Sequence, residues 1–389
     1  MMKSYLHVMF SSTFAWAGNI YDLVLITYIY TELEKAYGIN IFLVSLLFSL
    51  GLIGRFIGGS IFGNIADKIG RKPVLLLNTA GYAIFTGIMA FSPNVAMLFS
   101  ARIIQGIFMG GEWASGTVIS YEYAPRENVG TVIGVVQSGY GMGYALTGLT
   151  YILFLSSIGV NWRYFLLTGT LPLLIVPYAL LKIPKEKFVI KNNKPSLKPY
   201  KSYLIKITII MSGMFGAYFS IFSFYPTIAP VYGIKSSIVG ALMILVNIIL
   251  SLSFVLFGKI SRRINKRILI IISTVLLLFA AFLSMPFITN IFGLSVFGVV
   301  LYSFSAGDWA LIPMLLIEEV PEGIRATLSG ISYNLGALIG GVISVGIGFF
   351  AGIYGYSPFL IMLIDIIAIV LLLAVLITII SWKSSQNIS

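Results

Sequence analysis

The 389-residue sequence has no cysteine, a single histidine and only 13 acidic residues. Without cysteine the chain has no disulfide, no thiolate nucleophile and no cysteine-ligated zinc. The one histidine, His7, lies at the N-terminal edge, where we expect an interfacial residue in contact with water. An integral-membrane enzyme would need a nucleophile with a base, or a metal cluster, and almost no candidates are left. We therefore expect neither catalysis nor a bound cofactor or metal ion.

Charge is also scarce along the chain. Charged residues make up 10% of it and hydrophobic residues 58%, whereas a soluble domain keeps about 25% charged residues. Apolar runs of about 20 residues recur from end to end, and each can cross the hydrocarbon core of a lipid bilayer as a helix. These runs predict an all-α integral membrane protein with twelve transmembrane helices. The expected spans are 5–29, 41–65, 74–92, 95–121, 129–155, 163–182, 204–228, 236–259, 268–286, 289–317, 326–351 and 357–382.

The basic residues indicate how the chain is oriented. A net charge of +12 could suggest nucleic-acid binding, but the basic residues lie in short loops between apolar runs. With the N-terminus in the cytoplasm, 20 of the 25 basic residues lie inside, three lie outside, and Arg55 and Arg102 lie within the membrane. Such a bias predicts a multi-pass protein of the cell membrane with both termini in the cytoplasm. No small-residue cleavage site follows the first apolar stretch, so we expect that span to be permanent.

The two halves of the sequence repeat each other. Residues 62–72 return at a shift of 195 as residues 257–267, and residues 111–134 return at a shift of 196 as residues 307–330. Seven of the 24 positions in the longer stretch are identical, whereas chance would give roughly two. Internal duplication is characteristic of transporters that rock two related halves about a site at the midplane.

This repeat divides the chain into three expected parts. Residues 1–182 form one six-helix half, residues 183–203 a basic cytoplasmic linker, and residues 204–389 the second half. From Lys182 to Lys206 the chain holds eight lysines and one glutamate, so we expect the linker to lie along anionic lipid headgroups. We expect the protein to be a monomer.

The loop after the second span carries the most specific motif. It reads Gly-Asn-Ile-Ala-Asp-Lys-Ile-Gly-Arg-Lys, in which Gly63 allows close helix packing and Asp67 can receive helix-end or arginine charge. Gly70 turns the chain, and Arg71 and Lys72 anchor it at the inner face. The pattern resembles the signature loop of the major facilitator superfamily, which implies that these five residues gate the switch between facing states. The second-half copy matches less faithfully and is expected to gate more weakly.

The fourth span contains two charged residues at membrane depth, Arg102 and Glu112. A charge at the middle of the bilayer costs at least about 2.5 kcal/mol, so neither side chain should face lipid. Arg102, Gln105 and Trp113 share one helical face, and the Arg-x-x-Gln-Gly pattern resembles the fourth-helix motif of the superfamily. Burial would allow Glu112 to load and release a proton near neutral pH. A purely structural ion pair is the alternative for both residues.

Three further charged residues lie within expected spans. Asn19 and Asp22 are three residues apart on the first span, and we expect Asp22 to assist Glu112 in proton coupling. Arg55 in the second span is a candidate counter-ion to Asp22 or to an anionic substrate. Asp308 is the repeat mate of Glu112, so approximate two-fold symmetry should place these two acids on opposite walls of one cavity.

Aromatic and amide residues are candidates for shaping the substrate site, although membrane-protein cores use the same residue types for packing. Those of the expected site, beside Asn19, Arg55 and Arg102, are Trp113, Gln137, Tyr140, Tyr218, Trp309, Tyr333 and Asn334. Trp113 and Trp309 are the stronger candidates because they repeat beside the paired acids. Asp365 in the twelfth span is a weaker candidate for the site, because a polar contact on a peripheral helix explains its presence equally well.

Within the superfamily the chain resembles the metabolite:proton and sialate/lactate:proton symporter branches. Four pieces carry this resemblance, namely Asn19-x-x-Asp22, Arg55-x-x-Gly58-Gly59, Gly110-Gly111-Glu112-Trp113 and Asn161-Trp162-Arg163. In such proteins the first, fourth, seventh and tenth helices line a central cavity, and membrane acids couple the substrate to protons. The resemblance implies that Glu112, Asp22 and Asp308 take this role, and that a small organic acid or related metabolite is imported.

Other functions remain open alternatives. A sugar or polyol:proton symporter usually has Pro-Glu-Ser after the sixth span, where this chain has Ile183-Pro184-Lys185-Glu186. A drug:proton antiporter carries a Gly-Pro pair in the fifth span, whereas residues 138–143 contain no proline. Both departures favour a metabolite symporter. A sensor without transport activity, built on the same fold, is the alternative from a different class.

Overall fold

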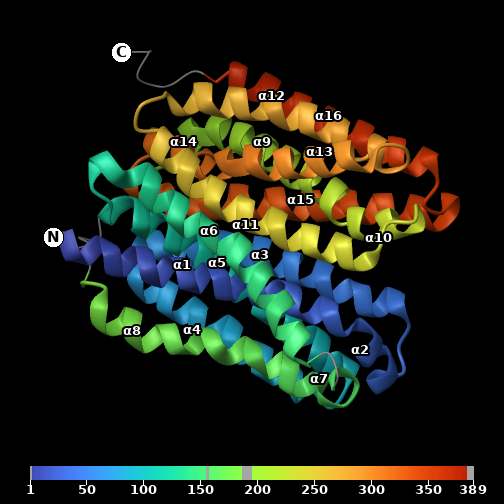
Figure 1. The fold of residues 1–389 in the computed structure, drawn as a ribbon. Coiled ribbons are helices and arrows are strands. Elements are labelled where there is room, and N and C mark those ends of the chain that lie inside the picture. Colours follow the sequence, from blue (N-terminus) through green and yellow to red (C-terminus); the bar gives the residue numbers. More distant parts are fainter. Residues whose placement is uncertain (1, 155–156, 186–194, 383–389) are drawn as a thin grey trace.

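The computed structural model describes residues 2–154, 157–185 and 195–382, and these residues form helices and connecting turns without any strand. The helices run side by side along one axis in two groups (Figure 1). The chain enters and leaves at the same end of the bundle, while α2, α7 and α10 mark the opposite end (Figure 1). Below, these are called the terminal end and the far end.

The first group holds the first six spans. The spans begin and end close to the expected positions, although the first and sixth are each built from several helical pieces. In chain order these elements are α1 (Met2–Leu25), η1 (Ile26–Ile29), α2 (Tyr30–Tyr37), α3 (Ile41–Ile69), α4 (Arg71–Ala90), α5 (Val95–Tyr123), η2 (Arg126–Asn128), α6 (Val129–Phe154), α7 (Ile158–Leu167), η3 (Thr168–Leu174) and α8 (Ile175–Lys182).

The second group holds the other six spans, of which the seventh and tenth are interrupted. Its elements are η4 (Lys198–Tyr200), α9 (Lys201–Phe222), α10 (Tyr225–Val231), α11 (Ser236–Ile260), α12 (Lys266–Ser284), η5 (Pro286–Ile288), α13 (Phe292–Ser305), η6 (Ala306–Ala310), α14 (Ile312–Glu319), η7 (Glu322–Ile324), α15 (Arg325–Tyr354) and α16 (Pro358–Ile380). The predicted twelve-helix fold is therefore confirmed. The expected linker 183–203 falls in part on residues 186–194, which lie outside the described residues.

The interruptions of the sixth, seventh and tenth spans occur where proline removes a backbone donor. Pro172 lies inside η3, Pro230 lies inside α10, and α14 has a proline within its first two positions. A proline cannot donate to the preceding turn, so short 3₁₀ segments or new helix starts replace a continuous helix there. Because of this, the tenth span presents Asp308 from η6, whereas its repeat mate Glu112 lies in the unbroken helix α5.

Two helix pairs hold the groups together, α3 with α15 and α6 with α11. A Cβ atom added at Gly63 would lie 2.5 Å from the Ala326 carbonyl oxygen, and one at Gly59 would lie 2.6 Å from that of Gly330. On the other pair, Gly258 and Gly130 meet backbone to backbone in the same way. Small residues allow such close approach of helices in a membrane. We call these two contacts the α3–α15 seam and the α6–α11 seam.

Hydropathy distinguishes three helices that carry buried polar residues of the site. Within the described residues, nine helical segments are long and apolar enough to cross a membrane by length and composition. Helices α1, α5 and α6 are not among the nine. They carry Asn19, Glu112 and Gln137, whose side chains are buried. The polar residues that lower the hydropathy of these helices thus face protein and not lipid.

Candidate functional site

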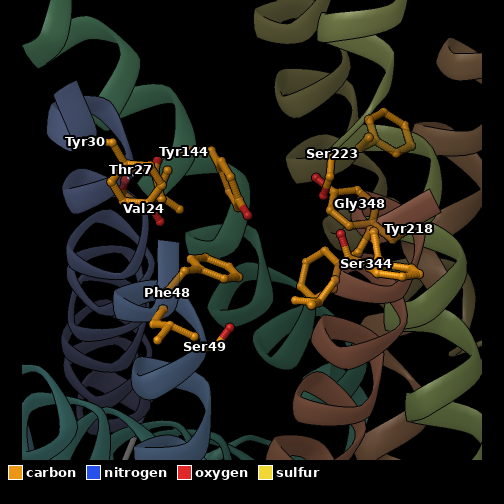
Figure 2. Close-up of a pocket in the computed structure, with 15 residues that line it drawn as sticks. Val24, Thr27, Tyr30, Phe48, Ser49, Tyr144, Tyr218, Ser223, Ser344 and Gly348 are labelled. Carbon is orange, nitrogen blue, oxygen red and sulfur yellow. Dashed lines mark hydrogen bonds between the residues drawn. The ribbon is translucent and has the colours of Figure 1, made fainter. Parts of the chain in front are cut away.

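A cavity of about 870 Å³ lies between the two groups of helices toward the far end of the bundle. Figure 2 shows the side chains of both groups facing each other across it. The cavity is lined by hydroxyl and apolar side chains, and no charged residue of the described chain lines it. Those lining it are Val24, Thr27, Tyr30, Leu46, Phe48, Ser49, Tyr144, Tyr218, Phe219, Phe222, Ser223, Ser344, Val345, Gly348 and Phe349.

An aromatic cluster lies next to the cavity on the side of the terminal end, and we call it the aromatic floor. It consists of Trp16, Trp113, Tyr140, Trp309 and Tyr333. Trp113 stacks on Tyr333 with 3.6 Å between ring centroids. Tyr140 touches the cavity residues Tyr144 and Tyr218. The floor therefore joins side chains from both groups of helices.

Glu112 lies buried beside this floor. Its Oε2 accepts a hydrogen bond of 2.7 Å from Asn19 Nδ2, which also donates to the Met109 carbonyl at 2.8 Å. Its Oε1 has no hydrogen-bond partner among the described residues. A buried carboxylate requires hydrogen bonds or a counter-charge while it is ionised, and a proton removes that requirement. Asn19 and Glu112, the residues predicted from the sequence for substrate binding and proton coupling, are thus in direct contact.

Arg55 provides the positive charge of the floor. It is 2% exposed, its Nε donates to Asn334 Oδ1 at 3.3 Å, and its guanidinium lies 5.2 Å from the Trp16 ring centroid. It also lies within electrostatic reach of Glu112. Since Asn334 is on α15, Arg55 links the two groups of helices at the depth of the floor. Nothing places Arg55 beside Asp22, the counter-ion considered from the sequence.

Asp22 and Arg102 are buried inside the first group, away from the cavity. Asp22 accepts a hydrogen bond of 2.7 Å from Thr86. Arg102 donates to the backbone carbonyls of Leu47 at 2.9 Å and Leu23 at 3.0 Å, and to Gln105 at 2.6 Å. The Leu23 carbonyl lies in the last turn of α1, just before η1, so Arg102 occupies an acceptor at a helix end there, whereas the Leu47 carbonyl belongs to α3.

Asp308 does not face Glu112 across a cavity. Its carboxyl group is completely buried in η6 and lies against Ser273 of α12, inside the second group. The expectation of two acids on opposite walls is therefore wrong in this conformation. The physical reason is the 3₁₀ turn, which rotates Asp308 away from the direction that an unbroken helix would give it.

The remaining expected substrate residues divide by depth. Tyr218 lines the cavity. Tyr140, Tyr333, Trp113 and Trp309 form part of the floor, and Gln137 donates to the Tyr333 hydroxyl at 3.3 Å. Sequence reasoning missed the hydroxyl residues Thr27, Ser49 and Ser344. Isolated serine or threonine in an apolar span is a weak signal, because such side chains often bond to their own helix.

At the terminal end the expected gating loop forms a cross-group network that we call the clasp. Asp67 accepts hydrogen bonds from the backbone N–H groups of Ala326 at 3.1 Å and Thr327 at 2.8 Å, and from the Thr327 hydroxyl at 2.6 Å. These N–H groups belong to the first turn of α15, where a carboxylate is favoured. Asp67 thus caps a helix of the opposite group.

Arg71 extends the clasp. It lies 3.3 Å from Asp67 and 3.2 Å from Glu122, and donates to the Glu322 carbonyl of the second group at 2.6 Å. Glu122 also pairs with Arg325 at 3.4 Å. Gly70 turns the chain with φ of 102°, a conformation that favours glycine. Lys72 donates to the carbonyls of Leu180 and Ile183.

Glu122 and Thr327 were not among the predicted gating residues. A signal for both was present, because Glu122 has an identical repeat mate in Glu318 and Thr327 has one in Thr131. Identity across a duplicated segment marks positions that both copies use. In the second copy Lys266 pairs with Glu318 at 3.0 Å, with side chains 24% and 36% exposed.

Comparisons with known proteins agree with this architecture. Residues 8–345 match the family model described as Major Facilitator Superfamily. The sialic acid transporter NanX of Escherichia coli K12 is 26% identical over 355 residues, covering 88% of this chain and 87% of NanX. A probable 4-methylmuconolactone transporter of Cupriavidus pinatubonensis is 26% identical over 352 residues, covering 86% of this chain and 81% of that protein.

Among solved structures, that of the human organic anion transporter MFSD10 superposes with a TM-score of 0.74. The match covers 95% of this chain and 99% of the other at 16% identity, which shows a shared fold. The family match over most of the sequence and the two groups of six spans together assign the chain to a family. The chain belongs to the Major Facilitator Superfamily, a family of multi-pass membrane transporters.

Proposed function

We propose that this protein imports a small organic acid together with protons, by alternating access of one central site to the two sides of the cell membrane. The observation that carries the proposal is the position of Glu112. It is a completely buried carboxyl group, one oxygen of which has no hydrogen-bond partner in the described part of the chain, and it lies beside the floor of a cavity between the groups. Such a group can hold a proton while the substrate occupies the cavity.

The direction follows from the charge bias of the loops. If both termini are cytoplasmic, the terminal end with its clasp is inside and the cavity faces outside. The conformation described is then outward-open, with the clasp closing the inner end. The halves 1–182 and 204–389 would move as two bodies about the seams, and a monomer suffices because the site lies within one chain.

Arg55 supports an acidic substrate. Its guanidinium lies at the floor, and a carboxylate pairs bidentately with guanidinium. A substrate carboxylate that displaced part of the floor would reach Arg55 and compete with Glu112 for its charge. Proton and substrate would then be linked through one cation. The names of the relatives NanX and the methylmuconolactone transporter are consistent with an organic acid or related metabolite.

A sugar or polyol is the second candidate substrate, favoured by the lining of the cavity. Thr27, Ser49, Tyr144 and Ser344 offer hydroxyl groups, and no charged residue of the described chain lines this cavity. Competition separates the two candidates. Carboxylates should displace bound ligand, and their esters or amides should compete poorly. If neutral sugars displace it better than any carboxylate, the sugar candidate replaces the organic acid.

The coupling role is tested with Glu112→Gln in proteoliposomes that carry an imposed pH gradient. Glutamine resembles the protonated acid, so the variant should still bind substrate and perform counterflow, which needs no net proton movement. It should lose accumulation against a gradient, because no proton is released inside. Asp365→Asn, a carboxyl change on the peripheral helix α16, is the matched control and should accumulate normally. Full accumulation by Glu112→Gln would remove Glu112 from the proton path.

A further inference from the structure

A second polar cavity lies at the terminal end between the two groups of helices. It has a volume of about 420 Å³ and includes Tyr121, Val129 and Gly130 of the first group and Ser261 and Met314 of the second. Its charged lining consists of four basic side chains and one acidic one, namely Arg126, Arg262, Lys266, Arg325 and Glu318. The cavity is therefore strongly positive, unlike the uncharged cavity at the far end.

The charges within this cavity are only partly paired. Glu318 pairs with Lys266 at 3.0 Å, and Arg325 pairs with Glu122 at 3.4 Å. Within the parts of the chain that the structure describes, neither Arg126 nor Arg262 has an ion-pair partner. Two guanidinium groups of exposed residues, one from each group of helices, thus line the same cavity without an ion-pair partner among the described residues.

Comparison of the two repeat copies shows that the second copy lacks the carboxylate that the first copy places at the start of a helix. Asp67 caps the first turn of α15 through Ala326 and Thr327. At the shifts of 195 and 196, the mate of Asp67 is Arg262, and the mate of Ala326 is Gly130 in the first turn of α6. Gly130 lines the cavity. At the place where symmetry would put a carboxylate, the chain has an arginine and an open space.

We propose that this cavity binds a phosphate group, which takes the place of the missing carboxylate beside the first turn of α6. A tetrahedral phosphate has several acceptor oxygens, so it can receive guanidinium donors that approach from different helices. The N–H groups at the start of α6 add a favourable dipole. The site is separate from the substrate cavity and does not depend on which substrate is carried.

The position of the site links phosphate binding to conformation. Arg126 belongs to the first group, whereas Arg262 and Lys266 belong to the second. Opening of the terminal end would separate these side chains and divide the site. A ligand that binds one conformation better shifts the population toward it. Bound phosphate therefore stabilises the form that is closed at the terminal end and open at the far end.

Two sources can supply the same chemistry, the phosphodiester of an anionic phospholipid headgroup or free inorganic phosphate. The experiment measures the far-end distance between spin labels at Lys35→Cys on α2 and Ser237→Cys on α11, both exposed. The cysteine-free chain needs no other change. The protein is placed in phosphatidylcholine nanodiscs alone, with added inorganic phosphate, or with phosphatidylglycerol, and no transport substrate is present.

We expect phosphate or phosphatidylglycerol to raise the ratio of the population with the long label distance to the population with the short one by about fivefold. This change is equivalent to about 1 kcal/mol. A response to inorganic phosphate identifies a soluble ligand, and a response to phosphatidylglycerol alone identifies the lipid. Arg262→Gln should abolish the response. Arg263→Gln, at the adjacent exposed arginine that does not line the cavity, should retain it.

Arg262→Asp provides an independent test that does not rely on loss of a response. It restores the carboxylate at the repeat position of Asp67, so it should raise the long-distance population in phosphatidylcholine alone and abolish any further response. The proposal is overturned if neither anion changes the distances, if Arg263→Gln removes the response as fully as Arg262→Gln, or if Arg262→Asp behaves like Arg262→Gln. Because no transport is measured, failure here leaves the symport proposal untouched.

Discussion

The two copies of the loop between adjacent spans differ in both charge and backbone, because α3 continues to Ile69 and the chain turns at Gly70, whereas α11 already ends at Ile260. In the first copy, Asp67 and Arg71 have fully buried side chains and form the clasp with α15. In the second copy, Arg262 replaces the carboxylate, and the pair Lys266–Glu318 remains partly exposed. The glycine contacts at the two seams are nevertheless alike. Duplication thus preserved the packing that allows movement, while only one copy keeps a strong closing contact.

Substitutions of the seam glycines test whether the two halves depend equally on close helix packing. Gly63→Leu and Gly258→Leu should have similar and large effects, because each side chain would meet the backbone of the facing helix. We expect a cost of about 3 kcal/mol for closing the terminal end, or more than a hundredfold in population. Transport and label distances at the terminal end measure it. Strongly unequal effects would mean that one seam alone carries the contact between the halves.

A substitution in the clasp tests whether the charged contacts of the first copy close the terminal end more strongly than those of the second copy. Asp67→Asn removes a buried carboxylate that accepts three hydrogen bonds from α15. Asparagine keeps one acceptor oxygen, so the net loss corresponds to about one charged hydrogen bond of about 1.5–3 kcal/mol, and transport should fall by about tenfold to a hundredfold. Substrate affinity, measured by equilibrium binding, should stay within a few-fold because the clasp is remote from the cavity. A large loss of binding with normal exchange between conformations would contradict the gating role.

The paired acids extend the comparison to proton coupling. Asp308→Asn should lower gradient-driven accumulation by less than about fivefold, or about 1 kcal/mol, whereas Glu112→Gln should abolish it. Glu112 lies beside the floor and contacts Asn19, but Asp308 faces Ser273 within its own half. Uptake by the two variants in one preparation of proteoliposomes provides the measurement. An Asp308 variant that loses accumulation completely would show that both halves couple.

The smallest effect is expected for the exposed pair of the second copy. Glu318→Gln removes the partner of Lys266, whose side chain is 24% exposed. Surface ion pairs contribute typically about 0.5 kcal/mol, so transport should change by about twofold. Uptake in phosphatidylcholine without phosphate isolates this pair from the anion site. A loss as large as that of Asp67→Asn would show that the second loop closes the protein as strongly as the first.

Much of the fold could be read from the sequence because the bilayer imposes simple rules. Twenty-residue apolar runs fix the spans, and the spacing of Gly63, Asp67 and Gly70 identifies the loop. The repeat supplies the symmetry that relates the two seams. These features depend on local composition and spacing, which a sequence displays directly.

The site was less predictable because side-chain direction depends on helix breaks. Arg102 bonds to the backbone carbonyls of Leu23, just before the change at η1, and of Leu47 in α3. Asp308 turns away from the midline because η6 replaces an α-helical turn. Helical periodicity does not show that η6 replaces an α-helical turn, nor which neighbouring backbone a long side chain such as that of Arg102 will reach, so it does not place either residue relative to the cavity. Asn19 and Glu112 lie in regular turns of α1 and α5 and contact each other directly.

The aromatic floor should affect how fast protons leak through the transporter when no substrate is bound. A symporter with an empty site can dissipate the standing ion gradient if its carboxyl group exchanges protons with water on both sides in turn. Here Glu112 is completely buried behind stacked Trp113 and Tyr333, apart from the lined cavity. If the protein is a proton symporter as proposed, we expect proton leakage through the empty transporter to be slow, so that it would consume little of the proton gradient when substrate is absent.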